Sequence, residues 1–343
     1  MKTIFAGIHC LLVAAVVSLL ATPVVAADSD SHQPDNVRRL APGGDGRWDY
    51  IVVDPATNRL YITRSTRVMV VDAESGKTLA EIADTAGVHG VALAPDLGVG
   101  FTSNGKENKV SVFDLKTFKE LKKIETGQNP DSILYHAPTH QVFVFNGTSH
   151  DATVIDAAKQ SVIATIPLAG RPEFSVADDS GNIYFNIEDK NSLGVIDAAQ
   201  RKVKNVWSLG NCEEPTGLAV DVKTQTAFSA CANKQLAVFD LKNGKVVQTV
   251  PIGDDCDAVA YDPATGNIIA SNGEGTLTII HKGGNGKYAV SNTVTTQPGS
   301  KTMALDAEHH RVYVPAAKFT GNPTARPRPQ MVAGSFEVLV VPE

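Results

Sequence analysis

Residues 60–82, LYITRSTRVMVVDAESGKTLAEI, contain the pattern that decides the fold. Three short runs rich in Val, Ile, Leu and other apolar residues are separated by turns that contain Ser65, Gly76 and neighbouring polar residues. Another apolar run, residues 51–53, precedes them across the turn at Asp54. Short runs of this kind, bounded by turn residues, are typical of antiparallel β-strands. The segment therefore predicts a small sheet of four strands.

The same pattern recurs along the chain with a fixed period. One marker is a turn residue that is followed seven positions later by an apolar or aromatic residue; its seven occurrences, 40 to 44 residues apart, are at Asp54, Ala94, His136, Ala177, Asp221, Asp262 and Asp306. A second marker, an aspartate that ends a β-branched run, recurs every 41 to 43 residues at Asp72, Asp114, Asp156, Asp197 and Asp240. Repeats of this length with four strands each are propeller blades. We therefore predict an all-β, seven-bladed β-propeller with four antiparallel strands per blade.

The two ends of the repeat region predict how the ring closes. The seventh unit ends with residues 336–341, which correspond to a third strand, and no fourth strand follows. The run at residues 37–40 precedes the first complete unit and has no other place in the repeat. We expect this N-terminal strand to complete the last blade, because closure removes exposed strand edges. The propeller would then span residues 37–343.

The first 27 residues are typical of a secretory signal peptide. Lys2 is followed by a mainly apolar run at residues 8–20 and by small residues around Ala26 and Ala27, after either of which we expect cleavage. A single-pass anchor is the alternative, but the run is short for a membrane span. We expect a disordered leader at residues 28–36, a periplasmic or secreted protein, and no membrane span after cleavage. The formal net charge of −6 argues against a general nucleic-acid-binding surface.

The repeat units resemble those of the YVTN family. The resemblance is carried by Leu60-Tyr61-Ile62-Thr63, by the run that ends at Asp72, and by Gly170-Arg171-Pro172 in a later unit. It extends over nearly all of the chain after the predicted signal peptide, and the whole is similar to YncE-like periplasmic propellers. That family includes binding proteins and propeller subunits of redox enzymes. The resemblance therefore implies the fold, and it leaves the function open.

One face of the predicted propeller carries a ring of polar side chains. Loops that enter the innermost strands surround the mouth of the central tunnel, where propellers usually bind ligands. Five equivalent or nearly equivalent positions there are acidic or histidine: Asp49, His89, Asp131, Glu173 and Asp257. Thr216 and Lys301 occupy the remaining two blades, Arg171 is expected nearby, and the long loop at residues 316–335 could cover the mouth.

Two interpretations of the ring remain open. Converging carboxylates are unfavourable unless a cation, a proton or Lys301 compensates them. Asp49, Asp131, Glu173 and Asp257 could hold a hard divalent ion such as calcium. Alternatively, the same side chains cap strand ends and bond to loop amides. The sequence does not choose between these interpretations.

Cysteine spacing predicts a disulfide but not its partners. Three cysteines follow the signal peptide, namely Cys212, Cys231 and Cys256, and an oxidising compartment favours a bond between two of them. Three pairings are possible. We favour Cys212–Cys256, which would join neighbouring blades through loops taken to be equivalent. We expect the remaining thiol to be buried and inert.

No motif commits the chain to one reaction. Gly-x-Ser-x-Gly, His-Glu-x-x-His and phosphate-binding loops are absent from the sequence. We therefore expect a monomeric binding or scaffold protein, without catalytic residues, that takes a small molecule or a protein partner at the tunnel mouth. One alternative is a calcium-dependent, lactonase-like hydrolase with His89 as a base. The other is a propeller subunit of a periplasmic redox complex.

Overall fold

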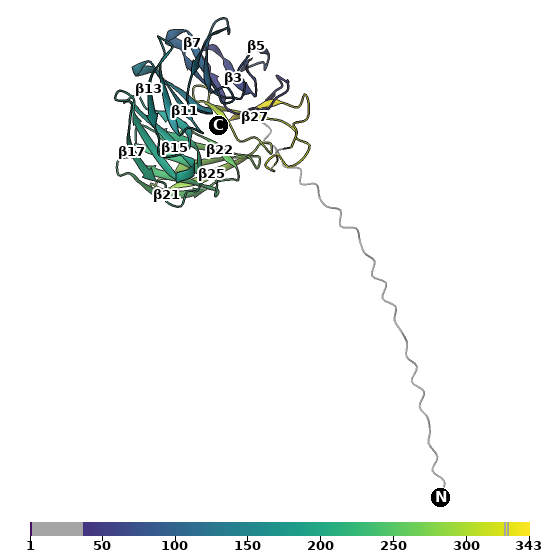
Figure 1. Ribbon diagram of the computed structural model, residues 1–343. Coiled ribbons are helices and arrows are strands. Elements are labelled where there is room, and N and C mark those ends of the chain that lie inside the picture. The colour runs from purple at the N-terminus through teal and green to yellow at the C-terminus, as the bar shows by residue number, and fades with distance from the viewer. Residues whose placement is uncertain (2–36, 326, 328) are drawn as a thin grey trace. The chain divides into compact units, whose positions relative to one another are not determined.

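Seven four-stranded antiparallel sheets surround a central axis in the computed structural model, as Figure 1 shows. The structure describes residue 1, residues 37–325, residue 327 and residues 329–343. The predicted seven-bladed propeller with four antiparallel strands per blade is confirmed. Apart from residue 1, the predicted signal peptide and leader lie outside the described residues.

In the first six blades the strands follow chain order across the sheet. Blade 1 contains β2 (Ile51–Asp54), β3 (Arg59–Arg64), β4 (Arg67–Asp72) and β5 (Thr78–Ile82). Blade 2 contains β6 (Val88–Ala94), β7 (Val99–Asn104), β8 (Lys109–Asp114) and β9 (Glu120–Glu125). Blade 3 contains β10 (Pro130–His136), β11 (Gln141–Asn146), β12 (Asp151–Asp156) and β13 (Ser161–Pro167).

The next three blades repeat this arrangement. Blade 4 contains β14 (Pro172–Ala177), β15 (Asn182–Ile187), β16 (Ser192–Asp197) and β17 (Lys202–Ser208). Blade 5 contains β18 (Pro215–Asp221), β19 (Thr226–Cys231), β20 (Gln235–Asp240) and β21 (Lys245–Pro251). Blade 6 contains β22 (Cys256–Tyr261), β23 (Ile268–Asn272), β24 (Thr276–Lys282) and β25 (Tyr288–Thr295). The helices among the described residues are single 3₁₀ turns: η1 (Pro55–Thr57), η2 (Pro95–Leu97), η3 (Ala137–Thr139) and η4 (Glu188–Lys190).

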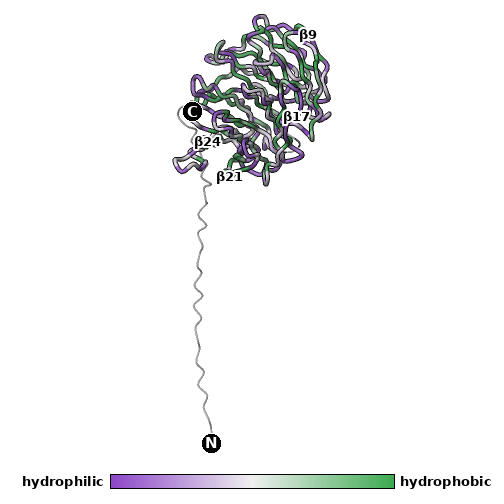
Figure 2. Tube along the Cα trace, turned by 90° about the vertical axis from the view of Figure 1, so that its left-hand side faces the viewer, coloured by the Kyte–Doolittle hydropathy of each residue, from purple (hydrophilic) through white to green (hydrophobic). Residues whose placement is uncertain are grey.

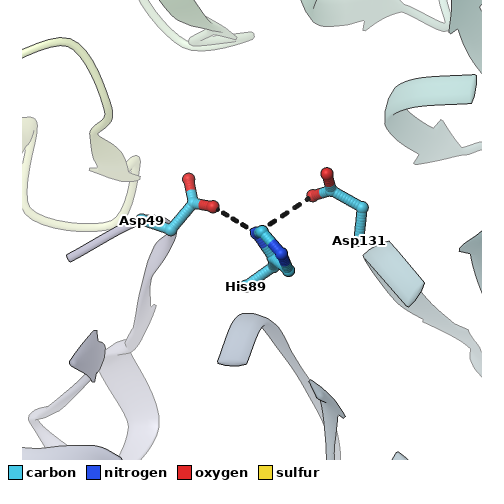
Figure 3. A group of neighbouring side chains, drawn as sticks. All are labelled: Asp49, His89 and Asp131. Carbon is cyan, nitrogen blue, oxygen red and sulfur yellow. Dashed lines mark hydrogen bonds and ion pairs between the residues drawn. The ribbon is translucent and has the colours of Figure 1, made fainter. Parts of the chain in front are cut away.

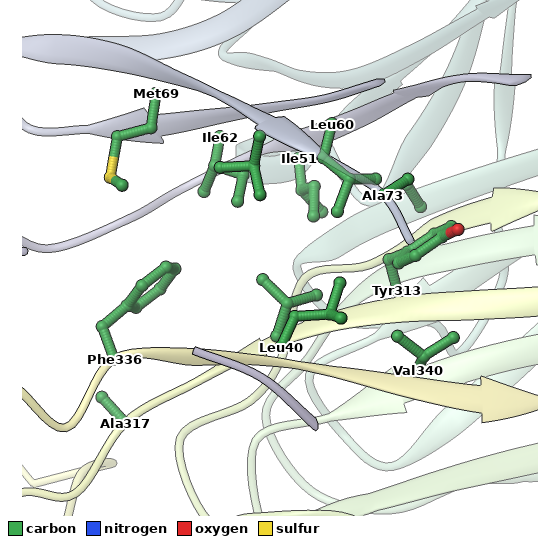
Figure 4. Packing of buried hydrophobic residues seen from close by; sticks show 13 residues of the cluster. Leu40, Ile51, Leu60, Ile62, Met69, Ala73, Tyr313, Ala317, Phe336 and Val340 are labelled. Carbon is green, nitrogen blue, oxygen red and sulfur yellow. The ribbon is translucent and has the colours of Figure 1, made fainter. Parts of the chain in front are cut away.

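Blade 7 joins the two ends of the propeller. It contains β26 (Ala304–Asp306), β27 (Arg311–Ala316) and β28 (Glu337–Pro342), and β1 (Arg38–Leu40) pairs with β28 as the fourth strand. Leu40 of β1 is buried in the cluster between blades 7 and 1, where Figure 4 shows it near Tyr313 and Val340. The predicted closure by the N-terminal strand is confirmed.

Both repeat markers have a physical explanation. The residues seven positions after the first marker are buried between strands, and six of the seven are aromatic: Tyr61, Phe101, Phe143, Tyr184, Phe228 and Tyr313, with Ile269 in blade 6. The repeated aspartates end third strands and cap the following turn; Asp72 Oδ1, for example, accepts a bond from Ser75 N at 2.7 Å. Figure 2 shows the hydrophobic segments running through the body of the propeller.

The predicted Cys212–Cys256 disulfide is wrong. Cys212 is bonded to Cys231, with the two Cα atoms 5.2 Å apart, so the bond joins the loop before β18 to the last residue of β19. The two favoured positions are not equivalent: Cys256 is the first residue of β22, as Pro215 is of β18, whereas Cys212 lies three residues before Pro215. The loop before β18 instead folds over the end of β19, where Ala232 N bonds to Glu213 O at 2.7 Å. Cys256 is a free, buried cysteine, and burial raises the pKa of its thiol.

Candidate functional site

The first strands of the seven blades form the wall of the tunnel. Neighbouring members of the set β2, β6, β10, β14, β18, β22 and β26 contact one another in order around the axis. In five of them the pairing with the second strand is interrupted near the tunnel mouth by a bulge, which contains His89, Asp131, Glu173, Thr216 or Asp257. A bulge inserts one unpaired residue and redirects its side chain. In these five blades the repeated bulge explains why one polar residue is presented at the same level.

The ring residues enclose a cavity of about 270 Å³ at the tunnel mouth. All six predicted ring residues with ionisable side chains line it: Asp49, His89, Asp131, Glu173, Asp257 and Lys301. The long loop of blade 7 forms one side through Phe319, Pro323 and Thr324, and Trp48 contacts Phe319 with ring centroids 5.9 Å apart. We call this space the tunnel-mouth cavity.

Arg171 does not line the tunnel-mouth cavity. Its guanidinium forms an ion pair with Glu188 of η4, and its backbone amide bonds to Asp189 Oδ1 at 2.7 Å. Arg171 therefore supports the turn that carries Glu188. The buried Arg64, by contrast, donates to the carbonyl oxygens of Gly43, Gly44 and Gly46 and has a structural role.

His89 lies between two carboxylates, as Figure 3 shows. Its Nδ1 donates a hydrogen bond to Asp49 Oδ2 at 2.6 Å and is 3.8 Å from Asp131 Oδ1. Burial alone would lower the pKa of His89, but the bond to Asp49 and the charges of Asp131 and Asp49 outweigh burial and raise the pKa to about 9. The imidazole is therefore positively charged at neutral pH and compensates part of the acidic ring.

The negative charges of Asp131 and Glu173 are less well balanced by neighbouring positive charge than that of Asp49. Burial raises the pKa of Asp131 to about 7, and Asp49 and Asp257 contribute to this rise although His89 opposes it. Burial, the charge of Asp131 and a hydrogen bond with Glu188 raise the pKa of Glu173 well above its usual range. The two carboxyl groups thus retain protons more readily than carboxyl groups in water do, because burial and the neighbouring acids favour the protonated form.

On the side of the cavity formed by Asp257 and Lys301, the net charge is closer to zero. Lys301 Nζ forms an ion pair with Asp257 Oδ2 at 2.8 Å, so this carboxylate already has a cationic partner. Asp49, His89 and Asp131 offer ligand atoms within 4.8 Å of one another and form the group at the mouth that could hold a metal ion. Glu173 and Asp257 of the predicted metal quartet are not in this group. A metal bound at His89 Nδ1 would have to displace the proton that Asp49 stabilises.

Sequence reasoning missed Tyr50, which lines the cavity just below the ring. Its ring packs on Phe174 with centroids 5.4 Å apart, and burial together with the charges of Asp131 and Glu173 raises the pKa of its hydroxyl. A second cavity of about 80 Å³, lined by Tyr50, Phe174 and Met303, lies beyond the aromatic pair. Four equivalent positions carry small residues, namely Gly90, Ser132, Gly217 and Ala258. Two large aromatics at a position that carries small residues in four other blades were the sequence signal for this aromatic contact.

No family model matches the chain. Protein YncE of Salmonella typhimurium, described as uncharacterized, is 30% identical over 105 residues, which is 29% of this chain and 30% of that protein. Antigen Lp49 of Leptospira interrogans is 25% identical over 173 residues, 48% of this chain and 38% of that protein. The chain thus spans less than two fifths of the length of either curated relative. Similarity to YncE is present but covers one part of the propeller.

Solved structures share the fold at low sequence identity. A hydrazine synthase chain of Kuenenia stuttgartiensis has a TM-score of 0.69 and 18% identity, and the match covers 84% of this chain and 95% of that chain. The U3-55K protein has a TM-score of 0.77 and 12% identity, with 91% of this chain and 99% of that chain covered. These likenesses establish the propeller and carry no function. Among the described residues, no helix has the length and apolar character needed to cross a membrane.

Proposed function

We propose that the chain is a binding protein whose tunnel-mouth cavity takes a small organic cation, such as a primary amine. The observation that carries this proposal is the pair formed by Asp131 and Glu173. Both carboxyl groups line the cavity, and both have a raised pKa because they are buried near other acids. A bound ammonium group would supply the missing positive charge and allow both groups to ionise.

The walls of the cavity support an organic ligand. Trp48, Tyr50 and Phe319 line it together with the carboxyl groups, and aromatic faces attract cations. The volume of about 270 Å³ exceeds the space of a single ion and approaches that of small-molecule sites. Tyr50 and Phe174 are in contact below the mouth, and we expect a ligand to bind at the mouth without passing through the tunnel. The absence of an assembled nucleophile and base in the sequence agrees with binding without catalysis.

A metal-dependent hydrolase is the second candidate, since Asp49, His89 and Asp131 form a group that could hold an ion. Calcium would use the carboxylates, but an imidazole is a poor calcium ligand. His89 as a general base is disfavoured because its pKa of about 9 leaves it protonated at neutral pH. This candidate requires one ion per chain at the mouth and hydrolysis that a chelator abolishes.

A propeller subunit of a redox complex is a third candidate. Its support is the family resemblance, since the YVTN family includes propeller subunits of redox enzymes. The test is co-purification of the chain with a cytochrome or quinoprotein in a stoichiometric complex. Isolation as a free monomer that binds an amine would favour the first proposal.

Titration calorimetry with putrescine, choline and calcium chloride distinguishes these proposals. We expect an amine to bind wild-type protein, and Asp131→Asn with Glu173→Gln to weaken that binding at least tenfold, because the double variant removes both anionic partners. Affinity should rise between pH 6 and pH 9 as the carboxyl groups become easier to ionise. Asp254→Asn, at an exposed carboxylate paired with Lys234 outside the cavity, is the matched control. Calcium binding without amine binding would favour the hydrolase, and no binding of any probe would contradict the proposal.

A further inference from the structure

A second cluster of ligand atoms lies on the face opposite the tunnel mouth, where blades 6 and 7 meet. Asp262 directly follows β22, His310 lies in the turn between β26 and β27, and Glu343 directly follows β28. First-to-second strand turns and the ends of third strands share this face, because each blade is an antiparallel meander. The backbone amide of Glu343 bonds to the carbonyl of His310 at 3.0 Å, which holds these two residues side by side.

The three side chains converge on one point. His310 Nδ1 is 2.9 Å from Asp262 Oδ2 and 4.0 Å from Glu343 Oε2. One ligand atom from each residue lies within 4.8 Å of the other two. The side chains of Asp262 and Glu343 are fully buried, whereas 48% of the His310 side chain is exposed. The cluster is therefore open to solvent on the histidine side alone.

Glu343 carries the observation that points to a missing partner. Its Oε1 accepts a bond from Thr265 Oγ1 at 2.8 Å, but its buried Oε2 accepts no hydrogen bond from any described residue. A buried carboxylate oxygen without a partner is unfavourable.

Equivalent turns in other blades lack this arrangement. Asp221 of blade 5 bonds to Lys223 N and Thr224 N of its own turn, which is the ordinary capping role of this position. His140 occupies the same turn position in blade 3 as His310 does in blade 7, yet it faces one carboxylate, Asp96, together with the Tyr135 hydroxyl. Turn capping therefore explains part of the role of Asp262. It does not explain a second buried carboxylate aimed at the same histidine.

We propose that Asp262, His310 and Glu343 bind one divalent ion of the zinc type. Imidazole and carboxylate ligands suit Zn²⁺, and Ca²⁺ would prefer a site with oxygen ligands throughout. Ligands bonded at about 2.0 to 2.2 Å in a tetrahedron lie roughly 3.4 Å apart, and the two distances from His310 Nδ1 fall on either side of this value. The exposed side of His310 leaves room for water as the fourth ligand.

An ion at this position would fasten the closing blade to its neighbour. Asp262 belongs to blade 6, whereas His310 and Glu343 belong to blade 7, whose outer strand β1 comes from the other end of the propeller. Binding to the folded chain alone stabilises it by mass action. We therefore expect Zn²⁺ to raise the melting temperature. This role is structural and independent of the proposed function of the tunnel mouth.

The test is a Zn²⁺ titration of the full chain after metal is stripped with EDTA and the chelator is removed. We expect one Zn²⁺ per chain by calorimetry and a higher melting temperature. His310→Ala and Glu343→Gln should each weaken binding by more than about tenfold and abolish the rise in melting temperature. His140→Ala, at the exposed histidine of blade 3, should bind Zn²⁺ as wild type does.

Circular dichroism of the variants and Zn²⁺ binding to Asp131→Asn serve as controls. Circular dichroism of the metal-free variants shows whether they are folded. Glu343→Gln replaces one carboxylate oxygen by an amide nitrogen, so it still tests the site if His310→Ala does not fold. Asp131→Asn removes a possible metal ligand at the tunnel mouth and should leave the Zn²⁺ affinity unchanged. Zn²⁺ binding that is lost in Asp131→Asn but kept in His310→Ala would overturn the proposal, and so would no binding at millimolar Zn²⁺.

Discussion

Asp131 is a carboxyl group held in a largely buried position, with 18% of its side chain exposed. Its neighbours include His89, which favours ionisation, and Asp49 and Asp257, which oppose it. Burial decides the balance, and the pKa rises to about 7. A binding residue of this kind lowers the stability of the empty protein, and the loss is recovered when a cation binds.

This raised pKa predicts a pH-dependent effect of Asp131→Asn. The folded chain holds the Asp131 proton more tightly than the unfolded chain does, so wild-type protein loses stability as the pH rises from about 4 to about 7. The variant lacks this loss. We expect its melting temperature relative to wild type to increase over that range and to level off at higher pH. Melting curves at several pH values, with Asp254→Asn as control, measure the difference. A difference that is the same at every pH would contradict the assigned pKa.

At the residue scale, repetition made six ring positions predictable, because each blade presents one polar residue at the same point. Tyr50 was missed because it lies one position further along, where most blades carry small residues. The disulfide was mispredicted because Cys212 and Cys256 differ by three positions in the repeat, a shift that needs the strand register to be seen. Contacts between blades, such as the Asp262–His310–Glu343 cluster, do not follow from a repeat at all.

β1 is a strand of three residues that completes blade 7. Its register places Arg38 opposite Val340 and Leu40 opposite Val338 of β28. Arg38 also donates to Glu74 of blade 1 at 2.6 Å, so the strand contacts both blades beside the closure. Such a short strand depends on the burial of Leu40 more than on its few backbone bonds.

We therefore expect Leu40→Ala to destabilise the propeller by about 2 to 5 kcal/mol, the usual range for a buried leucine. Leu40 is 3% exposed within the cluster that joins blades 7 and 1. Leu79→Ala is the matched control, since Leu79 lies on the outer strand β5 and is 46% exposed, and it should cost less than about 0.5 kcal/mol. Urea unfolding of both variants gives the comparison. Equal losses would show that β1 does not secure the closure.

At the element scale, strand number and order followed from the sequence, and strand starts did not. In blade 2 the continuous apolar run begins at Val91, but the first strand begins at Val88. The added residues include the bulge that contains His89. A bulge breaks the alternation of side chains that identifies a strand, so residues before it resemble a loop. The bulge makes the start of the strand hard to predict from the sequence, and the same bulge places His89 in the site.

The whole propeller combines a closed ring of strands with a polar cavity at the tunnel mouth. Neighbouring first strands contact one another around the axis, and β1 closes blade 7. The ring brings residues that are far apart in sequence, such as Asp49 and Lys301, to the same cavity. Architecture was predictable because a fixed period allows few folds. The identity of the ligand was not predictable, because propellers of this kind share the fold without sharing the chemistry of the tunnel mouth.

The central claim is that Asp131 and Glu173 bind a cation by exchanging their protons for it. Calorimetry of putrescine binding at pH 7, in two buffers of different ionisation enthalpy, counts those protons. The account predicts release of about 1.5 protons per putrescine bound, roughly half a proton from Asp131 and one from Glu173, and a much smaller release in the Asp131→Asn, Glu173→Gln double variant. Binding without proton release, or with proton uptake, would contradict the claim and show that the two carboxyl groups do not hold the ligand.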